Sequence, residues 1–201
     1  MPSRLLLLLI LLLAALLRFW QLGDLLPGLY HDEAYNGLDA LSLLQGKTFP
    51  QFYEGWELYA QEAHADHPAT PTRFPIFFEG NYGREPLHIY LMALAIWLFG
   101  PTPFALRFIP ALAGVLSVFT TYLAAKEIVN GQWSIANGQR PTPQSAIRNP
   151  QSLVPLFAAF FMAILFSAVH FSHFGLRMTL YVPAETLAVY FFWRGVNRGG
   201  E

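Results

Sequence analysis

The sequence predicts an all-α polytopic membrane protein, with about four transmembrane helices plus juxtamembrane helices in a long first outer loop. Of the 201 residues, 54% are hydrophobic and only 12% are charged, whereas soluble domains are about 45–50% apolar and about 25% charged. Several apolar runs approach the length needed to cross ~30 Å of hydrocarbon as a helix. The aromatic content of 16% also suits a chain that meets lipid–water interfaces.

Charge and composition exclude several classes of function. The formal net charge of -1 provides no basic surface, so we expect no nucleic acid partner. The sequence has no cysteine, which excludes disulfides, thiolate nucleophiles and Cys-based metal sites. Neither a Walker-type loop nor a GxGxxG loop occurs, so no nucleotide cofactor is expected.

The first predicted span covers residues 5–22 and begins with thirteen consecutive apolar residues. As a helix it would rise roughly 27 Å, close to the ~30 Å thickness of the hydrocarbon. We expect Arg18 to snorkel to the membrane surface beside Trp20. The alternative is a cleaved signal peptide with Arg4 as its basic region, although no clear A-x-A cleavage site follows.

Three later apolar runs predict the remaining spans. The second span covers 104–125, the uncharged third covers 153–171, and the shorter fourth covers 182–193 and contains Glu185. Between the second and third spans, residues 126–152 predict a cytoplasmic linker because much of this stretch is rich in Gly, Pro, Asn, Gln and Ser.

The predicted topology depends on whether the segment from Pro86 to Phe99 spans the membrane. Its fourteen mostly apolar residues are typical of an interfacial or re-entrant helix rather than a spanning one. If it does not span, six basic residues near the inner ends of the four spans lie inside, as the positive-inside rule favours. These residues are Arg4, Lys126, Arg140, Arg148, Arg194 and Arg198. We therefore expect the 23–103 loop and the 172–181 turn on the outer face.

An acidic pair in the outer loop has two interpretations. Asp32 and Glu33 directly precede a helix predicted over Ala34 to Leu44, with Gly46 as its stop. Acids at the start of a helix complement its dipole, so both residues could be purely structural. Alternatively, Asp32 faces a reaction centre at the membrane surface and accepts the proton of an attacking hydroxyl.

Two arginines on the predicted outer face are candidates for binding a phosphate. Arg84 stands just before a helix that Pro86 opens, near the positive end of the helix dipole. Arg177 in the 172–181 turn could hold a phosphate through a bidentate contact. The alternatives are a solvated cap or an Arg84–Glu85 pair, and a snorkelling Arg177 that marks a helix end.

One histidine pair raises the question of a divalent metal. His64 and His67 have an i, i+3 spacing that fits one face of a helix, with Asp66 between them. Pro68 and the residues after it predict a loop, and no further ligand is placed by spacing. We therefore expect no metal and no other cofactor, and a divalent metal is the alternative.

Together these motifs resemble those of the GT-C type membrane glycosyltransferases. The branch most similar comprises the dolichyl-phosphate-mannose–protein mannosyltransferases and the lipid A aminoarabinose transferases. The resemblance covers nearly the whole chain apart from the Asn130–Gln151 linker. It rests on Tyr30-His31-Asp32-Glu33-Ala34, Gly83-Arg84-Glu85-Pro86-Leu87-His88-Ile89-Tyr90-Leu91, Leu98-Phe99-Gly100, Arg107 and the Arg177 turn.

The resemblance implies transfer of a sugar from a polyprenyl-phosphate-linked donor to a membrane lipid, glycan or protein acceptor on the outer face. It implies that Asp32 is the catalytic carboxylate, that Glu33 supports it, and that Arg84 and Arg177 hold the donor phosphate. The other expected substrate-binding residues are Glu85, His88 and Tyr181. Because the sequence has no N-glycosylation acceptor, we expect a bacterial inner membrane rather than a eukaryotic compartment.

The chain departs from the family pattern in two ways. The family often carries a second acid a few residues past the position of Arg177, whereas the nearest acid here is Glu185. Family enzymes also have many more spans, so the chain resembles their N-terminal portion. The main alternative is a polytopic scaffold or a remnant without catalysis. A transporter is a weaker rival, because Glu185 is its one candidate for a buried midplane charge.

Overall fold

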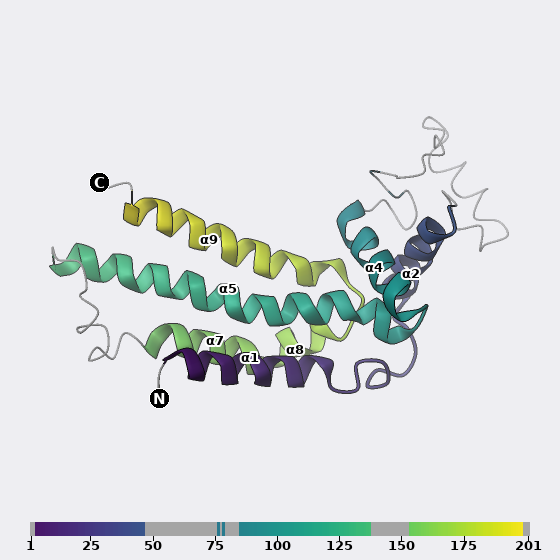
Figure 1. The fold of residues 1–201 in the computed structure, drawn as a ribbon, viewed down its shortest axis with the longest axis horizontal. Helices are drawn as coiled ribbons and strands as arrows, with labels where there is room; N and C mark the ends of the chain where they lie inside the picture. Colours follow the sequence, from purple (N-terminus) through teal and green to yellow (C-terminus); the bar gives the residue numbers. More distant parts are fainter. Residues whose placement is uncertain (1–2, 47–75, 77, 79–84, 138–152, 199–201) are drawn as a thin grey trace. The chain divides into compact units, whose positions relative to one another are not determined.

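The computed structural model describes residues 3–46, 76, 78, 85–137 and 153–198 (Figure 1). The helices in chain order are α1 (Ser3–Phe19), α2 (His31–Leu44), α4 (Pro86–Phe99), α5 (Pro103–Asn137), α7 (Val154–Ile164), α8 (Phe166–Ser172) and α9 (Tyr181–Arg198). A 3-10 turn, η2 (Arg177–Leu180), precedes α9. Apart from an isolated bridge at Phe78, the regular structure of these residues is helical, which confirms the prediction of an all-α protein for this part of the chain.

The chain divides into two compact units. Unit 1 comprises residues 1–20, 110–173 and 178–201, and unit 2 comprises residues 21–109 and 174–177. Helix α5 therefore contributes its first two turns to unit 2 and its remainder to unit 1.

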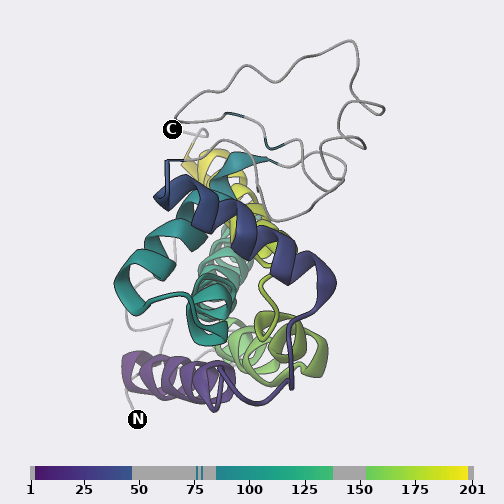
Figure 2. The ribbon, with the colours of Figure 1, turned by 90° about the vertical axis from the view of Figure 1, so that its right-hand side faces the viewer.

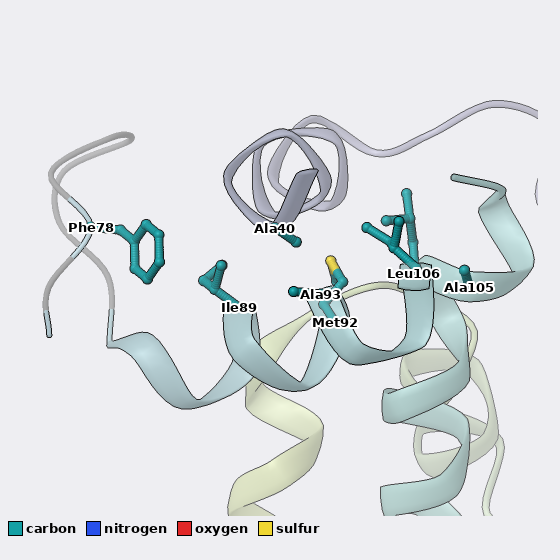
Figure 3. Close-up of a cluster of buried hydrophobic side chains, with 8 residues drawn as sticks. Ala40, Phe78, Ile89, Met92, Ala93, Ala105 and Leu106 are labelled. Atoms are coloured by element: carbon teal, nitrogen blue, oxygen red, sulfur yellow. The ribbon is translucent and has the colours of Figure 1, made fainter. Parts of the chain in front are cut away.

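Unit 2 is organised by the packing of α2 against α4 (Figure 2). Ile89 and Met92 of α4 point toward Ala40 of α2, and Leu106 of α5 joins the same cluster (Figure 3). Ile89, Met92 and Ala40 are almost fully buried. Burying a side chain such as Ile or Met contributes about 1.5–3 kcal/mol, so this small apolar cluster holds the two helices together.

Local sequence rules account for the ends of these two helices. Helix α2 begins after Tyr30, whose backbone N–H donates to the Glu33 carboxylate at 3.2 Å, as in a capping box. It ends just before Gly46, whose φ of 68° favours glycine as the predicted stop. Helix α4 has the bounds predicted for the 86–99 segment, with Pro86 at its first turn.

Unit 1 packs α1 against α7 and α8, and α9 lies along α5 (Figure 1). The core combines Ala14 of α1, Val118 of α5, and Ala159 and Ala163 of α7. The Thr120 and Thr186 hydroxyls, 2.6 Å apart, join α5 to α9. Small and hydroxyl-bearing residues at helix contacts are typical of helices that pack within a membrane.

One described helix is long and apolar enough to cross a membrane, namely α5 over Pro103–Asn130. The pair α7 and α8 passes the same test only if it counts as one span bent by 54°. Residues 126–137, the first part of the predicted 126–152 linker, are helical and continue α5. Linker residues 138–152 lie outside the described part of the chain.

The bend between α7 and α8 involves a buried arginine of α1. Arg18 donates to the carbonyls of Ala163 at 2.9 Å and Met162 at 3.0 Å. In an unbroken helix these carbonyls would accept from the N–H groups four residues later, at 166 and 167, just past the bend at Leu165. Arg18 is fully buried, so the expectation that it snorkels to the surface is wrong: its guanidinium donates to the last carbonyls of α7 instead.

Replacing Arg18→Met should destabilise unit 1, because two buried carbonyls at the end of α7 lose their donor. Each unsatisfied buried group costs about 1–3 kcal/mol. Thermal unfolding in detergent should therefore show a lower melting temperature, whereas the control Arg4→Met at the exposed start of α1 should unfold like the parent. Equal melting of both variants would contradict the capping role of Arg18.

Candidate active site

A buried ion pair connects α2 to the start of α5 in unit 2. Glu33 lies in the first turn of α2, and Arg107 lies near the start of α5. The Nε of Arg107 is 2.7 Å from Oε1 of Glu33, and its Nη2 is 3.3 Å from Oε2. The side chains are 1% and 0% exposed. Because neither charge meets water, each depends on the other for compensation.

All five N–H donors of Arg107 have acceptors. Besides its two bonds to Glu33, Nη1 donates to the carbonyls of Leu22 at 3.2 Å and Leu26 at 3.3 Å, and Nη2 donates to the carbonyl of Gly28 at 2.7 Å. Arg107 therefore also fixes the connection between α1 and α2. A lysine ammonium has only three donors and no planar fork, so it could not reproduce this set of bonds.

The Glu33 carboxylate is saturated as an acceptor. Oε1 accepts from Arg107 and from the backbone N–H of Gly175 at 3.1 Å. Oε2 accepts from Arg107 and from the backbone N–H of Tyr30 at 3.2 Å. A carboxylate has about four acceptor positions, so none is left for a substrate. Glu33 thus joins the turn that carries Asp32 to Arg107 and Gly175.

Asp32 occupies a different environment from its neighbour Glu33. Its side chain is 45% exposed, and Oδ1 lies 3.6 Å from Nδ1 of His31. The His31 ring packs edge-on against Tyr35, one turn further along α2. Of the acidic pair, Asp32 is therefore the member whose carboxylate an incoming hydroxyl can approach.

Gly175 joins the 174–177 segment to α2 and α4. Its N–H donates to Glu33, and its carbonyl accepts from Nδ2 of Asn36 at 2.8 Å and from Nε2 of His88 at 3.1 Å. Asn36 and His88 are each 3% exposed. This buried position argues against the direct substrate contact expected for His88.

Arg177 follows at the end of the same segment and pairs with Glu85. Nη1 of Arg177 donates to Oε2 of Glu85, with side-chain exposures of 42% and 61%. Glu85 precedes α4 as its N-cap residue. A hydrogen bond from its own backbone lowers the pKa of the Glu85 carboxyl; partial desolvation opposes this shift, and the nearby Arg177 charge reinforces it. Glu85 is therefore ionised at neutral pH, and both side chains are reachable from solvent.

The structure brings most of the expected site residues into unit 2, where Asp32, Glu33, Glu85, His88 and Arg177 all lie. Tyr181 belongs to unit 1, exposed at the start of α9. Arg84, His64, Asp66 and His67 lie outside the described residues. Within the described ranges, no group of three or more His, Asp or Glu residues is arranged to hold a metal ion.

Sequence reasoning missed Asn36 as part of this site. Asn36 lies three residues after Glu33, so both side chains share one face of α2. On an ordinary amphipathic helix polar residues indicate the solvent side, whereas here they mark the face that contacts Gly175. No family model, curated protein or solved structure matches this chain.

Replacing Glu33→Gln should destabilise unit 2 strongly, because Arg107 would keep its buried charge without a counterion. Breaking one partner of a buried ion pair costs about 3–5 kcal/mol. The control Asp32→Asn changes the adjacent, half-exposed acid and should leave the free energy of unfolding nearly unchanged. Denaturant titration of both variants measures the difference, and equal losses would show that the two acids share one structural role.

Proposed function

We propose that this chain belongs to an integral membrane glycosyltransferase that uses polyprenyl-phosphate-linked sugars, with Asp32 as the general base. The observation that carries the proposal is that the two acidic neighbours, Asp32 and Glu33, lie in different environments. Glu33 is buried and saturated by Arg107, Gly175 and Tyr30, while Asp32 next to it is half-exposed. Such a supported carboxylate suits proton abstraction from an acceptor hydroxyl.

The transfer then follows as an inverting displacement. The acceptor hydroxyl attacks the anomeric carbon, and Asp32 takes its proton as the new C–O bond forms. The bond between the anomeric carbon and the phosphate oxygen breaks, and the phosphate leaves with the electron pair. Arg177 stabilises the charge on this leaving group, and Arg84 is its expected second partner.

We place the chain in a bacterial inner membrane with four spans, and with the reaction on the outer face. Helix α5, and the bent pair α7 and α8 if it counts as one span, support the membrane part of this placement by their length and composition. The exposed apolar side chains of α4, among them Leu87 and Trp97, suit an interfacial helix. In this arrangement Asp32 and Arg177 lie at the membrane surface, where the head group of a lipid-linked donor is found.

A scaffold without catalysis is the second candidate, and one observation favours it. Asp32 stands in the first turn of α2, where an acid stabilises the helix dipole without any chemistry. Under this reading the Arg177–Glu85 pair is a surface ion pair of small energetic value. Activity measurements on an Asp32 variant separate the two candidates.

In the complete protein, Asp32→Asn should lower the rate of sugar transfer by at least about 10²–10⁴-fold, the usual contribution of general-base catalysis. Asn keeps the shape of Asp32 but cannot accept the proton. Turnover of a polyprenyl-phosphate sugar by purified protein measures this effect, with Asp24→Asn on the exposed segment after α1 as the matched control. Transfer at the parental rate by the folded Asp32 variant would favour the scaffold.

Glu85→Gln should tighten the binding of undecaprenyl phosphate by about 1.4–5-fold, since an exposed ion pair is worth about 0.2–1 kcal/mol. A phosphate that binds Arg177 must compete with Glu85 in the parent protein. Because the pKa of Glu85 is lowered, this competition is present at neutral pH and disappears as the pH falls through that pKa. The two affinities should therefore converge in acid, whereas weaker binding by the variant would mean that Glu85 itself binds the donor.

A further inference from the structure

A single backbone carbonyl in unit 2 is the meeting point of two buried side chains. Nδ2 of Asn36 reaches the Gly175 oxygen from α2, and Nε2 of His88 reaches it from α4. A carbonyl oxygen only accepts hydrogen bonds, so both nitrogens donate. For His88 this requires the proton on Nε2.

The other side of Gly175 is equally constrained. Its N–H donates to the saturated Glu33 carboxylate at 3.1 Å. A Cβ added at residue 175 would lie 2.8 Å from Cγ of Glu33 and 3.3 Å from the backbone oxygen of Leu106. Glycine is therefore needed for this close approach. The segment is held through both the N–H and the carbonyl of Gly175.

This anchoring limits where Arg177 can lie. Arg177 is two residues after Gly175, so its Cα stays within about 7 Å of the anchored glycine. Helix α4 contributes to both ends of the arrangement, because His88 holds Gly175 while Glu85, three residues earlier, pairs with Arg177. Helix α2 contributes Asn36 to the same anchor and also carries Asp32.

We propose that Asn36 and His88 are positioning residues for the donor phosphate. They act through the Gly175 carbonyl to hold Arg177 in a set position relative to Asp32. The proposal rests on the proposed function, in which Arg177 binds the phosphate of a polyprenyl-linked donor. Neither residue touches the donor, because both are buried beneath the segment that they hold.

Binding of undecaprenyl phosphate to the complete protein in lipid nanodiscs tests this proposal. Arg177→Gln is the reference variant and should weaken binding about tenfold or more, the loss expected for a charge-assisted hydrogen bond. Asn36→Asp, which replaces a donor with an acceptor, and His88→Leu, which removes the donor, should each weaken binding about as much. His88→Gln keeps an N–H at similar reach and should bind within about twofold of the parent.

A kinetic measurement separates positioning from general stability. With the complete enzyme, His88→Leu should raise the KM for the donor while the KM for the acceptor stays at the parental value, and His88→Gln should restore the donor KM. A structural defect would lower the active fraction and reduce kcat without this selectivity. Asn36 and His88 reach the same oxygen from different helices, so each variant that folds tests the positioning role.

The outcomes distinguish the phosphate-binding role of Arg177 from the positioning role of Asn36 and His88. If Arg177→Gln loses affinity while Asn36→Asp and His88→Leu bind like the parent, positioning through Gly175 is overturned and the phosphate role of Arg177 stands. If Arg177→Gln itself binds like the parent, the phosphate site of the proposed function is wrong, and the positioning role falls with it. Parallel losses in all three variants, with rescue by His88→Gln, support both.

Discussion

The ion pair between Glu33 and Arg107 is the interaction on which unit 2 depends. Two buried charges are tolerated only when their hydrogen bonds are satisfied, and here the guanidinium and the carboxylate both use their full bonding capacity. The pair ties α2 to α5, and its other bonds hold the connection from α1 and the 174–177 segment. Because these contacts occupy the Glu33 carboxylate, the proposed function assigns the general base to the half-exposed Asp32.

Where local rules decide the outcome, the sequence was sufficient to predict the fold. The bounds of α4 follow from Pro86 and the apolar run after it, and the end of α2 follows from Gly46. The bend at Leu165 has no such local sign, since no proline or glycine stands there. At this bend the guanidinium of Arg18 binds the carbonyl of Ala163, which is 145 positions away in sequence. A pattern read along the chain cannot find a contact of that separation.

The candidate site also has a part that the sequence could predict and a part that depends on tertiary contacts. Acidity beside a predicted helix start was enough to find Asp32 and Glu33, but their environments differ only through tertiary contacts. Arg107 interrupts an apolar run and could be noticed as unusual, yet its partner could not be chosen among the acids of the outer loop. His88 was expected in the site, but its contact and that of Asn36 could not be predicted, because their acceptor is a backbone oxygen, which every residue possesses and no side-chain pattern reveals.

The most direct test of this account is chemical rescue of the two acids in the complete enzyme. Asp32→Ala and Glu33→Ala would each be assayed for sugar transfer with increasing concentrations of formate. The half-exposed position of Asp32 predicts that formate enters the vacated space and restores transfer in that variant, while the buried and hydrogen-bonded position of Glu33 predicts no recovery. Recovery in the Glu33 variant, with none in the Asp32 variant, would contradict the assignment of the base.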